Sequence, residues 1–290
     1  MAQINVILAN GLGNQMLQYA FGRAHQLRGH TVTFSLNPDG CHNREDSRLC
    51  LPLRSHEVYG LDLLNTKVEF GPRLEFGPWR MENYVYAEVA FDPKWLKIEH
   101  PTNVYGLFWS EDYFKEFQDT IRKEFLPAPS LFIPPEAEAL AAKMRNSNSV
   151  FVHVRRSDWY LSPQGAEEWL LMSMEYYQKA VAKISERFPS PNVFVFSDNV
   201  GWCRENMPGW ETVTVGGGSP QIDLWLMRQC RHAVIANSSF SWWGAWLGDN
   251  QKDRMVVGPR KWWAKAGGAI KDGTQDSLHI MPDRWVCLDS

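Results

Sequence analysis

The second half of the sequence repeats one pattern, in which a short apolar run is followed by a segment whose apolar residues have helical spacing. The expected strands are residues 149–155, 192–196, 211–215 and 233–236, and the expected helices lie at 175–187, after Asn199, at 221–230 and after Ser239 through Leu247. Strands that alternate with helices form parallel sheets, because each helix returns the chain to the end where the strand began. The pattern therefore predicts an α/β domain with a doubly wound parallel sheet.

The first half opens with a shorter version of the same pattern. A strand at residues 4–8, a turn at 10–13, a helix and a strand at 31–36 form a predicted βαβ unit. The turn is typical of dinucleotide-binding proteins, except that Met16 stands at the position of the third glycine. Residues 37–110 are irregular and their elements are not assigned. Proline-rich residues 126–135 indicate a linker, and the predicted domains are residues 1–145 and 146–290.

Composition limits the partners and the compartment that we expect. The chain has 290 residues, of which 44% are hydrophobic, and it can bury more than one core. A formal net charge of -3 produces no field that would attract nucleic acid or an anionic membrane. Five scattered cysteines and the lack of a signal-like or membrane-spanning apolar stretch favour a cytoplasmic protein, with a peripheral contact at the inner membrane left open.

Polar residues at the end of the strand at 149–155 indicate an anion site. His153 and Arg155 are two residues apart, so both side chains lie on the same face of this strand. The rigid fork of guanidinium donors matches a phosphate, and the histidine can add a hydrogen bond. Alternatively, Arg155 and Arg156 are solvated charges paired with Asp158. We favour the anion site, because an arginine on a strand built for burial needs a partner.

Three further polar strings follow predicted strands. They are Asn237, Ser238, Ser239 and Phe240; Ser197, Asp198 and Asn199; and Gly11, Gly13, Asn14 and Gln15. A helix N-terminus with hydroxyls binds anions, glycines let the backbone approach a ligand, and a carboxylate can accept two hydrogen bonds from a guanine edge. For the second and third strings, and for Asp223, a turn with a helix N-cap is the alternative. The carboxyl ends of parallel strands share one edge, so one cleft can gather the strings of the second half.

Other chemistries lack their sequence signatures. The chain has no DxD for a divalent metal on a nucleotide diphosphate, no GxxxxGK[ST], no GxSxG and no HExxH. Its 14 tryptophans suit sugar rings, although Trp242, Trp243 and Trp246 on a helix-like segment favour packing. A metal-free enzyme that uses a nucleotide diphosphate is the hypothesis that remains.

Taken together, the strings resemble those of the bacterial α-1,2-fucosyltransferases, the galactoside 2-α-L-fucosyltransferase family. The matching residues are 11–20, 153–158, 196–199 with 202–203, and 223–227 leading to 236–245. The resemblance implies a GT-B-like α/β fold, with two Rossmann-like domains whose parallel sheets face each other across a cleft. The implied activity is inverting transfer of L-fucose from GDP-β-L-fucose to the 2-hydroxyl of a terminal β-galactoside, without a metal or other cofactor.

The resemblance also implies roles for individual residues. Arg155 would hold the β-phosphate and stabilise the charge that develops on the GDP leaving group. His153 would line the GDP site, and Asp158 completes the expected catalytic set. The other donor contacts are expected from Gly11, Gly13, Asn14, Gln15, Ser197, Asp198, Asn199, Asn237, Ser238, Ser239 and Phe240. Among these, Asp198 or Asn199 would read guanine.

The N-terminal domain is expected to supply the acceptor site. Residues 106–111 resemble a family segment that ends in Gln-Ser-Glu, so Trp109, Ser110 and Glu111 are the candidate acceptor contacts. Asp158 and Glu111 are the candidates for a general base. The chain departs from the family pattern at Leu17, Trp109, Ser157 and Asn199, where the family frequently has Phe, Gln, Gly and Asp.

The expected partners are GDP-fucose and an oligosaccharide acceptor such as lactose, a lacto-N-type sugar or an O-antigen precursor. Two other functions stay open. A fucosyltransferase for a protein hydroxyl or a different sugar position would have the same donor half. A non-catalytic sugar-binding protein would explain the tryptophans, but it has no use for paired arginines and a Ser-Ser turn at the ends of parallel strands.

Overall fold

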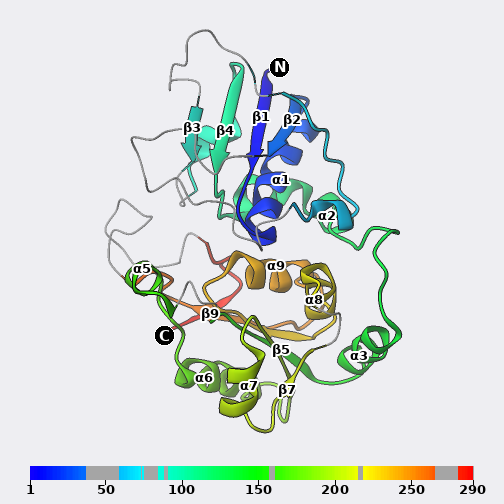
Figure 1. Cartoon of the computed structure of the whole chain (residues 1–290), viewed down its shortest axis with the longest axis vertical. Coiled ribbons are helices and arrows are strands. Elements are labelled where there is room, and N and C mark those ends of the chain that lie inside the picture. The colour runs from blue at the N-terminus through cyan, green and yellow to red at the C-terminus, as the bar shows by residue number, and fades with distance from the viewer. Residues whose placement is uncertain are drawn as a thin grey trace. The chain divides into compact units, whose positions relative to one another are not determined.

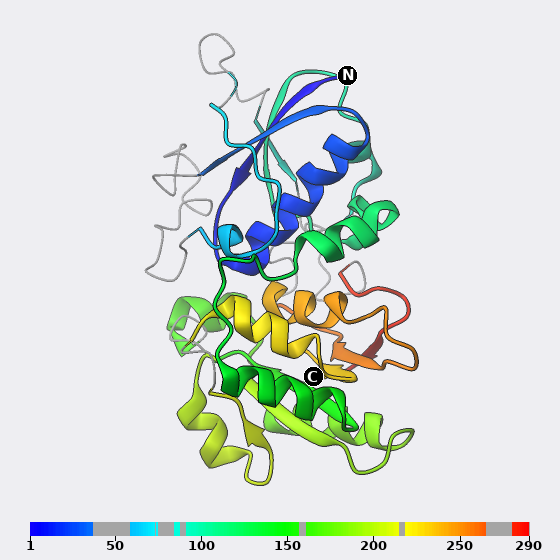
Figure 2. The same cartoon turned by 90° about the vertical axis from the view of Figure 1, so that its right-hand side faces the viewer.

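The computed structural model describes residues 1–36, 59–72, 74, 84–87, 91–156, 161–214, 218–264 and 280–289. The chain forms two compact units, Met1–Ser130 and Leu131–Ser290, each with one parallel sheet (Figure 1). The sequence places the division after residue 145, and the two positions differ by helix α3 (Pro135–Arg145). This helix packs against α8 (Pro220–Met227), and Figure 2 shows the two helices running side by side. It therefore belongs with the second unit.

The first unit is built on a four-stranded sheet with the order β2-β1-β4-β3 and parallel neighbours. Its strands are β1 (Gln3–Leu8), β2 (Thr31–Leu36), β3 (Tyr84–Ala87) and β4 (Thr102–Gly106). Its helices are α1 (Leu12–Leu27) and α2 (Gln118–Glu124), with short 3-10 turns at Leu61–Leu63, Pro93–Leu96, Glu111–Tyr113 and Lys115–Phe117. The βαβ opening is thus the one that the sequence predicts.

Helix α1 lies against β1 and β2 because its apolar residues recur at helical spacing and share one face. Met16 and Ala20 on this face are fully buried. The approach is closest at Gly22, where a side-chain carbon would lie 2.7 Å from the ring of Phe34 and 3.1 Å from Val6. Only glycine allows the helix to sit this close to the sheet.

The second unit contains a six-stranded sheet with the order β10-β9-β8-β5-β6-β7, again with parallel neighbours. Its strands are β5 (Ser149–Val154), β6 (Asn192–Ser197), β7 (Glu211–Thr212), β8 (His232–Val234), β9 (Val256–Pro259) and β10 (Val286–Leu288). Its helices are α3, α5 (Pro163–Glu168), α6 (Met174–Ser185), α7 (Val200–Asn206), α8 and α9 (Ser239–Leu247). The predicted α/β class is confirmed, whereas β9 and β10 were not predicted.

Helices cover both faces of the second sheet, as expected of a doubly wound fold. Figure 1 shows α8 and α9 on one side of the strands and α6 and α7 on the other. The alternation within β5 follows from this arrangement. Val150, Val152 and Val154 belong to the core cluster that includes Tyr176 and Tyr177 of α6. Since neighbouring side chains of a strand point to opposite faces, His153 points toward the side of α9.

Within the described ranges, no helix combines the length and the apolar character that crossing a bilayer requires.

Candidate functional site

The second sheet changes its direction of growth at β5. The chain adds β6 and β7 on one side of β5 and then places β8 on the other side. Parallel sheets bind ligands outside the carboxyl ends of the strands at such a switch point. Here the residues that follow β5 are Arg155 and Arg156, the string at 197–199 follows β6, and the string at 237–240 follows β8. The order β8-β5-β6 therefore places three of the predicted strings at neighbouring strand ends.

His153 links the strings that follow β5 and β8. Its ring centroid lies 5.5 Å from that of Phe240 in the first turn of α9. The side chain is buried, and burial together with the nearby charge of Arg155 lowers the pKa of His153 to about 3. Its buried Nδ1 has no hydrogen-bond partner among the described residues. His153 is therefore neutral near pH 7, which suits a hydrogen bond to a ligand and not a proton transfer at that pH.

The carboxylate of Asp198, which follows β6, binds both arginines that follow β5. Its Oδ2 lies 2.8 Å from Arg155 Nη1, and its Oδ1 accepts a hydrogen bond of 2.7 Å from the backbone N–H of Arg156. The Arg156 guanidinium lies over the ring of Trp202 in α7, 3.9 Å from the centroid. The two arginine side chains thus have different partners. Asp158, the carboxylate that the sequence offered as their partner, lies outside the described residues.

The other residues of the string after β6 form a turn and a helix cap. The Oγ of Ser197 accepts a hydrogen bond of 2.9 Å from the N–H of Asn199. Asn199 is the N-cap of α7, and its Oδ1 accepts a hydrogen bond of 3.0 Å from the N–H of Trp202. The oxygens that the sequence assigned to a guanine edge thus already accept hydrogen bonds from this chain. The geometry favours the structural interpretation of Ser197, Asp198 and Asn199.

The N-terminus of α9 is the clearest anion-binding feature of the second unit. Ser238 is the N-cap, with an extended backbone and no hydrogen bond from its side chain to the first turn. Ser238, Ser239 and Phe240 are all half-buried. The N–H groups of the first turn carry the positive end of the helix dipole, and the two hydroxyls can add donors. This terminus and Arg155 follow adjacent strands, so both belong to the edge of the sheet at its switch point.

Asn237 holds this junction together. The side chain is buried, and its Nδ2 donates hydrogen bonds of 2.8 Å to the carbonyl oxygens of both Leu170 and Trp262. These two residues lie on segments far from Asn237 in the sequence. These contacts give the amide nitrogen of Asn237 a structural role beyond the end of β8, and the donor contact expected of this residue stays a prediction.

The first sheet has its own switch point, between β1 and β4, because β2 lies on one side of β1 and β4 on the other. One predicted donor contact and one predicted acceptor contact meet there. The indole Nε1 of Trp109, which follows β4, donates a hydrogen bond of 3.3 Å to Oδ1 of Asn14 in the first turn of α1. Trp109 is buried and Asn14 is half-buried. The two strings of this unit thus form one local structure.

Two glutamines of α1 use their amides to connect backbone segments. The side chain of Gln15 donates a hydrogen bond of 2.7 Å to the carbonyl oxygen of Asn10 and accepts one of 3.1 Å from the N–H of Gly60. The side chain of Gln18 accepts a hydrogen bond of 2.8 Å from the N–H of Ala9 and donates one of 3.0 Å to the carbonyl oxygen of Gly106. Gln18 thereby ties the ends of β1 and β4 together. The sequence did not single it out, although a glutamine on the apolar face of a helix was the available signal.

The remaining predicted residues of the first unit occupy turns. Gly11 is the N-cap of α1 with a φ of -68°, a value open to any residue, and Gly13 is buried within the helix. Ser110 is buried and caps the turn Glu111–Tyr113, because its Oγ accepts a hydrogen bond of 3.2 Å from the N–H of Asp112. Glu111 is half-buried in the same turn. Of these, Glu111 is the side chain with acid–base chemistry.

Asp223 is a half-buried carboxyl of the second unit with an altered acidity. It lies in the first turn of α8, and burial raises its pKa to about 7. Its side chain has no hydrogen bond or ion pair with any other described residue. Such a group is a functional candidate, although buried carboxyls also occur in structural positions.

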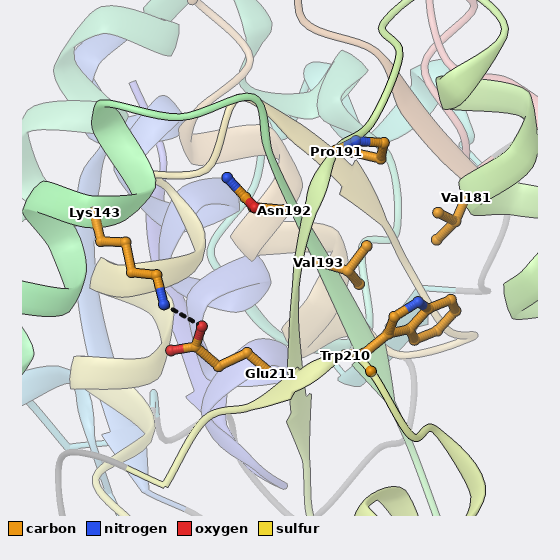
Figure 3. Close-up of a pocket in the computed structure, with 8 residues that line it drawn as sticks. Lys143, Val181, Pro191, Asn192, Val193, Trp210 and Glu211 are labelled. Carbon is orange, nitrogen blue, oxygen red and sulfur yellow. Dashed lines mark hydrogen bonds and ion pairs between the residues drawn. The ribbon is translucent and has the colours of Figure 1, made fainter.

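A hollow of about 370 Å³ lies at the opposite edge of the second sheet (Figure 3). Asn192 and Glu211, which open β6 and β7, line it together with Trp210, and Lys143 of α3 forms an ion pair with Glu211. Strand β6 runs six residues from Asn192 to Ser197, a length of roughly 17 Å. The hollow is therefore separate from the polar strings. Among the described residues, no three His, Cys, Asp or Glu side chains are grouped to hold a metal ion.

The model of the family described as glycosyl transferase family 11 matches residues 72–266. An alpha-1,2-colitosyltransferase of Escherichia coli is 28% identical, over 97% of this chain and 97% of its own length. The O-antigen biosynthesis glycosyltransferase WbnK of Escherichia coli is also 28% identical, over 97% of this chain and 99% of its own length.

A galactoside alpha-(1,2)-fucosyltransferase 1 of Oryctolagus cuniculus is 30% identical, over 81% of this chain and 61% of its own length. Among solved structures, NodZ alpha-1,6-fucosyltransferase soaked with GDP-fucose matches with a TM-score of 0.45 and 14% identity, over 84% of this chain and 92% of that one. A structural similarity at this TM-score does not identify site residues in this chain.

Proposed function

The chain belongs to glycosyl transferase family 11, and we propose that it transfers L-fucose from GDP-β-L-fucose to the 2-hydroxyl of a terminal β-galactoside. The arrangement at the switch point of the second sheet carries the proposal. A neutral buried histidine near the end of β5, the arginine just after that strand and the N-terminus of α9 beyond the adjacent strand β8 come together there. This combination of one full positive charge with several neutral donors suits a nucleotide diphosphate.

In this proposal, the second unit stabilises the leaving group. Arg155 binds the β-phosphate and stabilises the charge that grows on it as the bond to fucose breaks. Ser238 and Ser239 donate hydrogen bonds to the phosphates, together with N–H groups of the first turn of α9. These hydrogen-bonding groups are part of the fold before GDP-fucose binds, so the protein needs little reorganisation during the reaction. They fulfil the electrostatic task of a divalent metal, and we propose a reaction that needs none.

The acceptor hydroxyl attacks C1 of fucose from the face opposite to GDP, which inverts the configuration there. Because C1 carries positive charge as GDP leaves, a general base has only to take the proton late in the step. Glu111 in the first unit is half-buried, and it remains a candidate for this base beside Asp158. The Trp109–Asn14 pair is proposed to lie at the acceptor side.

The names of the relatives support the α-1,2 linkage more strongly than they support fucose as the transferred sugar. One is a galactoside alpha-(1,2)-fucosyltransferase and another an alpha-1,2-colitosyltransferase, so both names specify an α-1,2 bond. Since the colitosyltransferase matches over 97% of this chain, transfer of colitose is the second candidate function. The alternative donor proposed for this chain is GDP-colitose, which carries colitose on the same nucleotide in place of fucose.

The test is GDP release from GDP-L-fucose and from GDP-colitose in the presence of EDTA, with lactose, lacto-N-tetraose or buffer as the acceptor. We expect release from GDP-L-fucose that rises only with a galactoside, and an α-1,2 linkage in the product by NMR. GDP release from GDP-colitose but not from GDP-L-fucose would show that colitose, and not fucose, is the transferred sugar. GDP binding without release would contradict the acceptor, and activity that EDTA abolishes would contradict the metal-free mechanism.

A further inference from the structure

We propose that Asp198 is a positioning residue for Arg155, which holds the guanidinium in the orientation that meets the leaving diphosphate. The inference rests on the proposed function of Arg155 as the phosphate ligand. It replaces the expectation that the Asp198 carboxylate reads the guanine base, because that carboxylate already binds within the chain.

Asp198 contacts the arginine string at two points. Its Oδ1 accepts a hydrogen bond from the backbone N–H of Arg156, and its Oδ2 forms the ion pair with the Arg155 guanidinium. The first contact fixes the backbone just beyond β5, and the second fixes the side chain that projects from it. Because β5 and β6 are adjacent parallel strands, Asp198 makes both contacts from the neighbouring strand end. A single carboxylate therefore sets the position and the direction of Arg155.

Stability alone is a weak reason for this ion pair. The side chains of Arg155 and Asp198 are 30% and 21% exposed, and ion pairs of this exposure contribute little to folding. A carboxylate beside a phosphate site also repels the ligand, so its presence there calls for a compensating role. Arginine loses much rotamer freedom when it is fixed, and fixing it before the donor binds removes that cost from the reaction.

The two contacts can be separated by substitution. Asp198→Asn keeps an oxygen for the Arg156 N–H and removes the charge that pairs with Arg155. Asp198→Ala removes both contacts, and Asp198→Glu restores the charge on a longer side chain. Glu186→Gln is the matched control, since it breaks the ion pair of Glu186 with Lys183 on the same unit, away from the polar strings.

We expect Asp198→Asn to lower kcat for transfer by about tenfold, while KM for GDP-fucose changes by less than about threefold, because Arg155 acts mainly on charge that develops in the transition state. Asp198→Ala should lower kcat by about a hundredfold. Asp198→Glu should recover part of the loss, and Glu186→Gln should match the parent. Circular dichroism and thermal melting establish that each variant is folded, and Asp198→Asn remains the decisive variant if Asp198→Ala does not fold.

Wild-type kcat and KM in Asp198→Asn would overturn the proposal, and so would a gain in activity or in GDP affinity, since the carboxylate would then compete with the phosphate. Arg155→Ala, measured alongside, separates this inference from the proposed function. An inactive Arg155→Ala with an unchanged Asp198→Asn contradicts only the positioning role. An active Arg155→Ala contradicts both.

Discussion

The two units have the same local topology but different chemistry at their switch points. In the first unit, the amides of Asn14, Gln15 and Gln18 bond to the indole of Trp109 or to backbone groups, and a nearby charged side chain beyond β4, that of Glu111, is acidic. In the second unit, the residues beyond β5 and β8 bring together the Arg155 guanidinium and a helix N-terminus. A parallel sheet thus provides the place for a ligand, and the side chains decide which ligand suits it.

Under the proposed function, the charged part of the reaction belongs to the second unit. The diphosphate needs positive charge, which the second unit supplies at its switch point. The proposed acceptor contacts in the first unit are different in kind, since Asn14 is a half-buried neutral amide and Trp109, which donates to it, is buried. Substitutions in the two units should therefore have different effects on donor and acceptor.

The largest effect is expected from Arg155→Ala in the second unit. Loss of the guanidinium removes charge stabilisation of the leaving group, and we expect transfer to fall by about a thousandfold with the fold intact. The measurement is single-turnover transfer from GDP-L-fucose, with circular dichroism as the check on folding. Arg145→Ala is the control and should retain activity, because it removes an exposed arginine at the end of α3 that donates a hydrogen bond to Gln229, just beyond α8. Activity in Arg155→Ala within tenfold of the parent would contradict the claim that the second unit stabilises the leaving group through Arg155.

Asp223 gives the second unit a pH-dependent stability. Burial raises its pKa to about 7, above the value of about 3.9 for an unfolded aspartate, so the folded state holds the proton more tightly. This contribution is complete below pH 4 and is lost as the pH rises to 7, by about 2 to 4 kcal/mol. Asp223→Asn should therefore gain stability relative to the parent between pH 4.5 and pH 8 in urea unfolding. An equal difference between the two proteins at both pH values would contradict a raised pKa.

Gly22→Ala tests the first unit alone. The added carbon would lie 2.7 Å from the ring of Phe34, so α1 must move from the sheet, and we expect a loss of about 1 to 3 kcal/mol in the free energy of unfolding. Gly11→Ala is the control on the same helix, because nothing lies within 4 Å of the added carbon there. GDP affinity should be unchanged in Gly22→Ala at a temperature where the variant is folded. A large drop in GDP affinity would place the nucleotide on the first unit.

The smallest effect is expected from Trp109→Phe. It keeps an aromatic ring at the end of β4 and removes the hydrogen bond to Asn14. We expect KM for the galactoside to rise by about two- to tenfold, as the loss of one neutral hydrogen bond allows, with KM for GDP-L-fucose unchanged. Initial rates over a grid of donor and acceptor concentrations separate the two constants. A rise in the donor KM alone would reverse the assignment of the two units.

The fold was accessible from the sequence because each element has a strong local pattern. Strand β2 coincides with the predicted residues 31–36, and β6 begins at the predicted residue 192 and ends one residue beyond the predicted end. Strands β9 and β10 were missed, since they are four and three residues long and no helix pattern separates them clearly from their surroundings. The sequence places the division after residue 145, and the packing of α3 on α8, which puts α3 in the second unit, is a tertiary contact that no local pattern reveals.

The position of the candidate site in the second unit could be predicted from the sequence, but the hydrogen bonds and ion pairs among its side chains could not. That polar strings follow β5, β6 and β8 can be read from the chain, and parallel topology then places them at one edge. Which side chains stay available depends on contacts between these strings. The sequence could not show that Asp198 binds Arg155 and the Arg156 N–H, or that the amide of Asn237 is used by Leu170 and Trp262.

The most direct test of the central claim is calorimetric titration of GDP into the full chain and into its Arg155→Ala and Trp109→Phe variants, with EDTA present. If the nucleotide diphosphate binds at the switch point of the second unit, Arg155→Ala should lose at least about tenfold in affinity, because a charge-assisted hydrogen bond is lost, and Trp109→Phe should bind like the parent. Equal affinity in the parent and Arg155→Ala, or a loss confined to Trp109→Phe, would contradict the account.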